Sequence, residues 1–179
     1  MIRILAMAAA LTMAMCFSAS AEEAATVNPG ESSAADMRGG GVVMELSLSR
    51  GVPFRVFTLD SPLRLVVDFK GLNTEAIPAE AMVQQSAAIS GLRSGVFRPG
   101  WSRLVADLDA PLLPRETGMR IDDSSGQAML SLVLEPVSPG VFAEASGVPA
   151  TALWAQEPDV PTRDPAQGDL MVVAIDPGH

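Results

Sequence analysis

The sequence predicts a mainly β protein, with a small β-sandwich first, then a linker, and then the first strand of a truncated α/β domain. Residues 42–135 alternate apolar and polar side chains with a period of two, and turn-forming residues divide them into short strands. Many short strands with frequent turns are typical of a β-sandwich. Residues 136–169 contain six prolines and predict an extended linker. Residues 170–175 are all apolar, as in a strand buried on both faces of a parallel sheet.

The first 21 residues have the features of a secretory signal peptide. Arg3 supplies a short positive start, residues 4–17 form an apolar core, and Ala19-Ser20-Ala21 supplies a cleavage signal. Because the apolar run is too short for a transmembrane span, we expect export with no integral membrane segment after cleavage. The expected location is the periplasm of a Gram-negative cell. Residues 22–41 are small, polar and rich in Gly, Ser and Ala, and predict a disordered leader.

The composition excludes several classes of function. The only cysteine, Cys16, lies within the signal peptide, so the mature chain has neither a disulfide nor a catalytic thiol. Cleavage also removes Arg3, which leaves 11 basic and 21 acidic side chains and a formal charge of −10. Nucleic-acid binding depends on basic surface that neutralises phosphates, so we expect no nucleic-acid partner.

Short strands and one short helix account for most of residues 42–135. The apolar positions of each strand share one face, and Gly, Pro, Asp and Asn mark the turns between strands. The strands are expected at residues 42–48, 54–59, 63–69, 89–97, 102–108, 119–121 and 128–134, and the helix at residues 79–86. The last two strands are expected to form a closing hairpin.

One strand pattern occurs twice. Arg64-Leu-Val-Val-Asp-Phe69 returns as Arg103-Leu-Val-Ala-Asp-Leu108, with Arg and Asp on one face and three apolar residues on the other. Two similar strands, one from each half of the domain, fit a sandwich in which each sheet contributes an inward apolar face. Alternatively, the pattern is simply that of an amphipathic strand in an arginine-rich protein.

Two stretches of this region resemble the AMIN domain. They are residues 53–69, Pro-Phe-Arg-Val-Phe-Thr-Leu-Asp-Ser-Pro-Leu-Arg-Leu-Val-Val-Asp-Phe, and residues 89–98 followed by 102–108. AMIN domains are small β-sandwiches that precede amidase domains and also occur in pilus secretins, and they are thought to bind peptidoglycan. The resemblance therefore implies a peptidoglycan-binding β-sandwich over residues 42–135.

The polar side of the strands is the expected binding surface. Its candidate carboxylate contacts are Arg55, Arg64, Arg93, Arg98 and Arg103, because the planar guanidinium group suits carboxylates, which peptidoglycan stem peptides carry. Trp101 is a candidate for stacking on a sugar face. The alternative is that these arginines pair with neighbouring aspartates, Asp68 and Asp107 first, on a solvated face.

The end of the chain carries a second resemblance. After the apolar run, Asp176-Pro-Gly forces a turn that presents His179, the only histidine, at the carboxyl end of a strand. The run 172–179 resembles the opening strand and first metal-binding loop of zinc-dependent N-acetylmuramoyl-L-alanine amidases, which cleave the amide bond between N-acetylmuramic acid and L-alanine of the stem peptide. This resemblance implies Zn²⁺ as cofactor and His179 as a zinc ligand. Asp176 either orients the imidazole through a hydrogen bond or caps the turn.

Two function classes follow from these resemblances. The first is an exported peptidoglycan hydrolase, of which this chain supplies the targeting domain, the linker and residues 170–179 of the catalytic domain. The other zinc ligands and the catalytic glutamate are expected downstream, so the chain by itself is expected to be inactive. The resemblance also implies an activator partner of the LytM type. The second class is a non-catalytic peptidoglycan-binding module of an envelope assembly protein.

Overall fold

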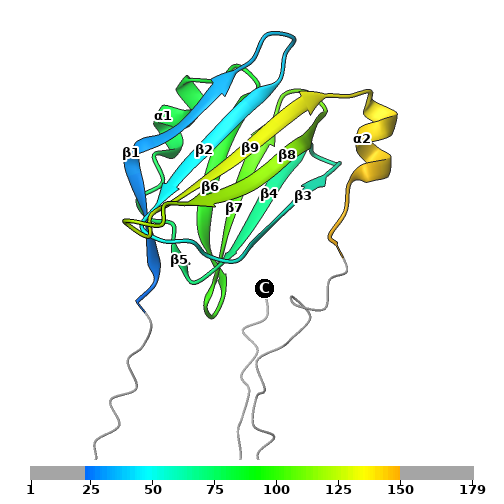
Figure 1. The fold of residues 1–179 in the computed structure, drawn as a ribbon. Coiled ribbons are helices and arrows are strands. Elements are labelled where there is room, and N and C mark those ends of the chain that lie inside the picture. Colours follow the sequence, from blue (N-terminus) through cyan, green and yellow to red (C-terminus); the bar gives the residue numbers. More distant parts are fainter. Residues whose placement is uncertain (1–22, 150–179) are drawn as a thin grey trace, which may run out of the picture.

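Two stacked β-sheets flanked by two short helices make up residues 23–149, which are the residues that the computed structural model describes (Figure 1). The first sheet has the strand order β5-β1-β2-β9-β8. Its strands are β1 (Ala25–Asp36), β2 (Val42–Leu48), β5 (Leu72–Asn73), β8 (Leu112–Ile121) and β9 (Ala128–Pro136). Neighbouring strands are antiparallel, except that β1 and β5 are parallel.

The second sheet is entirely antiparallel and has the strand order β3-β4-β7-β6. Its strands are β3 (Phe54–Leu59), β4 (Arg64–Lys70), β6 (Ile89–Arg98) and β7 (Trp101–Leu108). Helix α1 (Ala79–Gln84) lies against β6 and β1 at one side of the sandwich. Helix α2 (Pro139–Ala145) lies at the opposite side (Figure 1). The predicted mainly β sandwich is confirmed.

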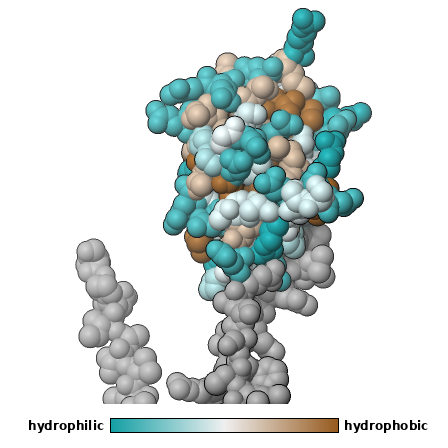
Figure 2. All heavy atoms as spheres, turned by 60° about the vertical axis from the view of Figure 1, so that its left-hand side comes forward, coloured by the Kyte–Doolittle hydropathy of each residue, from teal (hydrophilic) through white to brown (hydrophobic). Residues whose placement is uncertain are grey.

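The core lies between the two sheets and consists of every second residue of the central strands. Because side chains alternate between the faces of a strand, one apolar face of each sheet is removed from water. The buried side chains of β2 and β9 are Val42, Met44, Leu46, Leu48, Ala128, Leu130, Leu132 and Leu134. The side chains of β4 and β7 that belong to the hydrophobic core are Leu65, Val67, Phe69, Leu104, Ala106 and Leu108. The side of the molecule with β1 and α1 shows mostly hydrophilic side chains, with scattered hydrophobic ones (Figure 2).

The strands predicted from periodicity agree with the structure where local alternation is strong. The predicted strands 42–48 and 54–59 are β2 and β3, and the predicted helix at 79–86 is α1. Strand β8 begins earlier than the predicted residue 119, at Leu112. Its first part contains Pro114 and a bulge between Pro114 and Glu116, which interrupts the period-two pattern in the sequence.

The prediction of a disordered leader is wrong for residues 25–36, which form β1. Pairing with β2 and β5 supplies backbone hydrogen bonds that composition does not reveal, and a bulge between Asn28 and Ser33 absorbs the irregular part. Ala25 and Val27 are buried in the core. The carboxylate of Asp36 accepts hydrogen bonds from Ser86 Oγ (2.5 Å) and Ala87 N (2.9 Å), which ties the end of β1 to the exit of α1.

The predicted extended linker is likewise wrong at its start, where residues 139–145 form α2. Ser138 caps this helix by accepting from the Val141 N–H, and Pro139 occupies its first turn, where proline is tolerated. Phe142 is fully buried in the core. After the helix, Gly147 N donates to Thr58 O of β3 at 2.8 Å. The folded domain therefore extends beyond residues 42–135 at both ends.

The two copies of the repeated Arg-Asp pattern lie in the same sheet. Strands β4 and β7 are antiparallel neighbours, with Arg64 opposite Asp107 and Asp68 opposite Arg103. Antiparallel pairing of two identical patterns reverses one of them, so each basic position meets an acidic one. The repeat therefore brings its charges together on a single face.

Several predicted segments lie outside the described residues. They are the signal peptide, most of the linker, and residues 170–179 with Asp176 and His179. Within residues 23–149, neither helix has the length and apolar character needed to cross a membrane.

Candidate functional site

The outer face of the second sheet gathers most of the domain's cations. We call it the basic face, and it consists of the side chains that point away from the core along β3, β4, β7 and β6. Its six basic residues are Arg55, Arg64, Lys70, Arg93, Arg98 and Arg103, its acidic residues are Asp68 and Asp107, and its aromatic residues are Phe57, Phe97 and Trp101. The formal charge of this face is +4, on a chain whose formal charge is −9.

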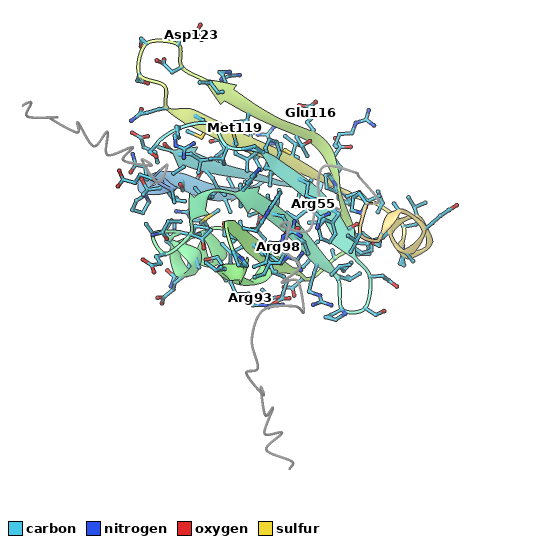
Figure 3. The ribbon with its side chains drawn as sticks, turned by 90° about the horizontal axis from the view of Figure 1, so that it is seen from below. Arg55, Arg93, Arg98, Glu116, Met119 and Asp123 are labelled. Atoms are coloured by element: carbon cyan, nitrogen blue, oxygen red, sulfur yellow. The ribbon has the colours of Figure 1, made fainter. Side chains whose placement is uncertain are left out.

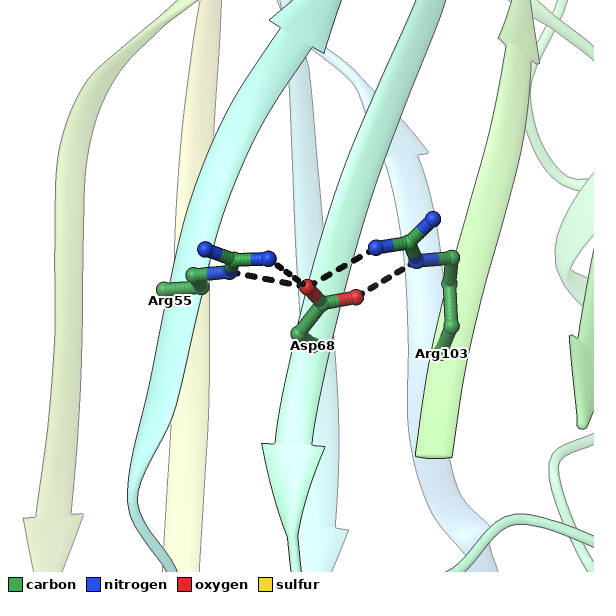
Figure 4. A network of polar contacts seen from close by, with 3 residues as sticks. All are labelled: Arg55, Asp68 and Arg103. Carbon is green, nitrogen blue, oxygen red and sulfur yellow. Dashed lines mark hydrogen bonds and ion pairs between the residues drawn. The ribbon is translucent and has the colours of Figure 1, made fainter. Parts of the chain in front are cut away.

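Asp68 is the centre of the basic face. It lies directly opposite Arg55 on β3 and Arg103 on β7, so the sheet register places one carboxylate between two guanidinium groups. Arg55 donates to Asp68 Oδ2 from Nε at 2.8 Å and from Nη2 at 2.7 Å. Arg103 donates to Oδ1 from Nε at 2.6 Å and to Oδ2 from Nη2 at 3.0 Å (Figure 4).

The Asp68 side chain is completely buried, whereas those of Arg55 and Arg103 are 15% and 33% exposed. A buried carboxylate is tolerated only when it is paired and hydrogen-bonded, and two arginines meet both conditions. The three groups together carry one positive charge. Arg55 and Arg103 are therefore held in fixed positions, and the excess charge lies at the surface.

Aromatic rings fix the orientation of Arg103 further. Its guanidinium carbon lies 4.4 Å from the Phe97 ring centroid and 5.7 Å from the Phe57 ring centroid. Asp68 occupies Nε and Nη2, and Nη1 makes no polar contact with any residue of the described domain. Asp68 and the two rings thus hold the guanidinium group of Arg103 in place, and its Nη1 can donate to a further acceptor.

A second arginine–aromatic pair lies at one end of this face. The guanidinium carbon of Arg98 lies 4.5 Å from the Trp101 ring centroid and 5.4 Å from the Phe97 ring centroid. Trp101 begins β7 directly after the tight turn at Gly100, whose φ of +73° is readily adopted only by glycine. This turn places Trp101 opposite Arg98 in the β6–β7 register.

The remaining cations differ in how they are paired. Arg93 forms an ion pair with Asp107, in which the side chains are 55% and 33% exposed. Arg64 makes one weak contact, from Nε to Pro62 O at 3.4 Å, and neither Arg64 nor Lys70 has an ion-pair partner among residues 23–149. Half-buried Arg64 and exposed Lys70 therefore keep their charge available for an anionic ligand.

The structure thus brings the predicted contacts Arg55, Arg93, Arg98, Trp101 and Arg103 onto one face. The expected alternative, pairing with Asp68 and Asp107, is found for Arg55, Arg93 and Arg103. Asp68, however, is buried and does not lie on a solvated face. Sequence reasoning did not select Lys70, although its place two residues after Asp68 gives the signal, because alternate residues of a strand share a face.

The opposite side of the sandwich has a different character. Arg55, Arg93 and Arg98 belong to one layer, whereas Glu116 and Asp123 belong to the other (Figure 3). Residues 23–149 contain no group of three or more His, Cys, Asp or Glu side chains arranged to hold a metal ion.

Comparison with protein families agrees with this description. The model of the AMIN domain matches residues 34–128, which is more than half of the chain. The chain belongs to the AMIN domain family. AMIN domains are peptidoglycan-binding and targeting modules and occur in periplasmic or secreted proteins. The match begins within β1 and ends at the start of β9, so the folded domain continues past it through α2. A search of curated proteins found no match to the chain.

Proposed function

We propose that this AMIN domain binds peptidoglycan through its basic face, with stem-peptide carboxylates as the groups recognised there. The observation that carries the proposal is the anchoring of Arg103 by buried Asp68 and by the Phe57 and Phe97 rings. A guanidinium group that is already fixed loses little side-chain entropy when an anion binds. Asp68 takes the Nε and Nη2 of Arg103, so Nη1 can donate a hydrogen bond to a carboxylate oxygen of the ligand.

Charge supports the choice of ligand. Arg64 and Lys70 flank Asp68 on β4, and the charge of the face as a whole is +4 on an acidic chain. A polyanionic wall polymer is attracted to such a face and repelled by the rest of the protein, which fixes the orientation of binding. Trp101 and Phe97 supply apolar surface on which a sugar ring can lie.

We also propose that the domain targets a zinc-dependent N-acetylmuramoyl-L-alanine amidase to the cell wall. This part rests on the resemblance of residues 172–179, with His179 as a ligand and Asp176 beside it. When bound in such an enzyme, zinc lowers the pKa of a water molecule and polarises the scissile carbonyl. His179 would supply one of the zinc ligands, the other ligands and the catalytic glutamate would come from residues downstream of it, and an activator of the LytM type would be a partner.

The second candidate function is that of a non-catalytic peptidoglycan-binding module in an envelope assembly protein. One observation favours it: the side chains that make up the basic face all come from residues 55–107. One assay separates the two candidates. The protein encoded by the complete open reading frame is incubated with sacculi, with and without added zinc, and the release of stem peptides is measured. Release that requires His179 supports the amidase, and binding without release supports the module.

Co-sedimentation with purified sacculi tests the binding face. The chain and its Arg103→Ala variant are compared with Arg120→Ala, which removes one cation from the other sheet. We expect Arg103→Ala to weaken binding about tenfold or more, because a charge-assisted hydrogen bond contributes about 1.5 kcal/mol or more. We expect Arg120→Ala to bind as the parent does. Equal binding by all three proteins, each shown to be folded by circular dichroism, would contradict the proposal.

A further inference from the structure

A cleft adjoins the basic face at one end of the sandwich, between the two sheets. Its volume is about 610 Å³, and its lining residues are Gly51, Val52, Pro53, Phe54, Lys70, Trp101, Met119 and Ile121. Met119 and Ile121 come from β8 of the first sheet, whereas Phe54, Lys70 and Trp101 come from β3, β4 and β7 of the second. Ligand cavities in proteins have volumes of about 300–1,000 Å³, so the cleft has room for a short peptide segment.

The walls of the cleft are apolar, and Lys70 is the only charged residue within 23–149 that lines it. Lys70 has no ion-pair partner within residues 23–149, and no acidic side chain lines the cleft. Three other cavities on this domain all include carboxylates, among them Glu45, Glu75 and Asp122. Such a combination suits a ligand that has small aliphatic groups and a single negative charge.

The position of Lys70 is fixed by the backbone around it. Lys70 N donates to Pro53 O at 2.9 Å, and Lys70 lies directly opposite Trp101 in the β4–β7 register. Gly51 supports the other wall, because a Cβ atom at this position would lie 2.7 Å from Ile121 Cδ1. Because Gly51 has no side chain, Ile121 and Met119 can pack directly against its backbone and form this wall of the cleft.

We propose that this cleft binds the free C-terminal end of a short peptide with methyl side chains, with Lys70 pairing with the terminal carboxylate. The proposal rests on the proposed function, since it assigns the alanine-ended stem peptide of peptidoglycan to the cleft. The apolar walls of Phe54, Trp101 and Ile121 take the methyl groups. The basic face next to the cleft then contacts the other carboxylates of the same polymer.

The chain has a single lysine, which allows a direct test. Reductive methylation with ¹³C-formaldehyde labels Lys70 and keeps its charge, and the Lys70→Arg variant identifies its NMR signal by loss. Acetyl-D-alanyl-D-alanine is titrated into the labelled full chain, and its C-terminal amide serves as the matched ligand. We expect a saturable shift of the Lys70 signal with the acid, and an affinity about tenfold lower for the amide.

Two variants extend the test to the wall of the cleft. Ile121 is 54% exposed, so Ile121→Glu places a carboxylate at the rim with little risk to the fold, and Ile121→Gln is its neutral control. We expect Ile121→Gln to weaken binding of the acid about threefold, because it removes part of the apolar wall, and Ile121→Glu to weaken it about tenfold more, because it also repels the carboxylate. An equal effect of both variants would overturn the assignment of charge to this site.

The outcome separates this inference from the proposed function. If the parent chain sediments with sacculi but the acid leaves the Lys70 signal unmoved, or the amide binds as tightly as the acid, the cleft assignment is wrong and the basic face stands. If the acid shifts the Lys70 signal saturably but the chain does not sediment, the cleft assignment stands and the basic-face proposal fails. Arg103→Ala is expected to retain the response of Lys70 to the acid.

Discussion

The two outer faces of the sandwich are built by the same alternation and differ in what they display. The basic face carries arginines, one lysine and aromatic rings around a buried aspartate. The outer face of the first sheet carries small, aliphatic and acidic side chains, which we call the acidic face. Its members include Ser33, Val43, Glu45, Ser47, Glu116, Gly118, Arg120, Met129, Ser131, Val133 and Glu135.

In both sheets, the inward residues of a strand serve folding and its outward residues are available for binding. Both faces are backed by the same core, because the inward positions of the central strands are apolar apart from residues such as Ser102 of β7. Only the basic face has a polar group, Asp68, that is fully buried and shared by two strands on either side. Its outward residues are therefore held in place by one another, whereas those of the acidic face have no comparable anchor among the described residues.

The largest expected effect comes from removing that anchor. Asp68→Asn keeps the shape of the side chain but leaves Arg55 and Arg103 facing each other without a compensating charge. We expect the free energy of unfolding to fall by about 3 kcal/mol, measured by urea denaturation. Asp107→Asn, which breaks the exposed pair with Arg93, is expected to cost less than about 1 kcal/mol. Equal losses for the two variants would show that Asp68 is not the structural centre of the face.

Charge reversal compares the two faces directly. The double variant Arg64→Glu and Lys70→Glu changes the basic face, and Arg115→Glu and Arg120→Glu makes the same change of net charge on β8. We expect the first to reduce sacculus binding at least about tenfold and the second to reduce it less than about threefold. Similar losses in the two variants would mean that net charge, and not the location of the cations, determines binding.

Salt is expected to change sacculus binding less, through the same cations of the basic face. We expect binding of the parent chain to sacculi to weaken several-fold between about 0.05 M and about 0.5 M NaCl, because exposed charges are screened over that range. The Arg64→Glu and Lys70→Glu double variant, which lacks the unpaired cations, should show a flatter dependence in the same sedimentation assay. A steeper dependence in that variant would count against the basic face.

The smallest effect concerns a carboxylate that neutral groups stabilise. Asp122, in the turn between β8 and β9, accepts hydrogen bonds from Ser124 and Ser125, and these lower its pKa from 3.8 to about 2. Since the folded pKa is the lower one, this stabilisation is fully present above about pH 4 and is lost as the pH falls through about 2. Asp122→Asn is expected to flatten the decline in stability between pH 4 and pH 2, measured by thermal unfolding. A decline as steep as that of the parent would refute this role.

Local alternation was enough to predict the central strands, but not their irregular neighbours. β2, β3 and β9 keep period two without interruption, whereas β1 and β8 contain bulges that shift it. The segments with α2 and β1 have the small, polar or proline-containing composition of linkers. Phe142 and Val27 are nevertheless buried, because contacts with distant strands supply what local composition lacks.

The candidate site was likewise predicted in its local features but not in those that depend on strand pairing. The sequence indicated which arginines would point outward and that Asp68 and Asp107 were their nearest partners. It did not reveal that β4 and β7 are neighbours in one sheet, which places Asp68 between Arg55 and Arg103. The cleft beside Trp101, which Lys70 lines, was missed for a related reason, since four strands and a loop meet there from separate parts of the chain.

The sequence by itself determined the class of fold, the core positions and the family resemblance, because amphipathic alternation is a property of neighbouring residues. Tertiary structure alone decided which strands pair, that residues 25–36 and 139–145 join the domain, and that one carboxylate anchors two arginines. Strand pairing brings together residues that are far apart in the chain, and a shift of one residue would send every side chain to the other face. The binding face is a consequence of that register.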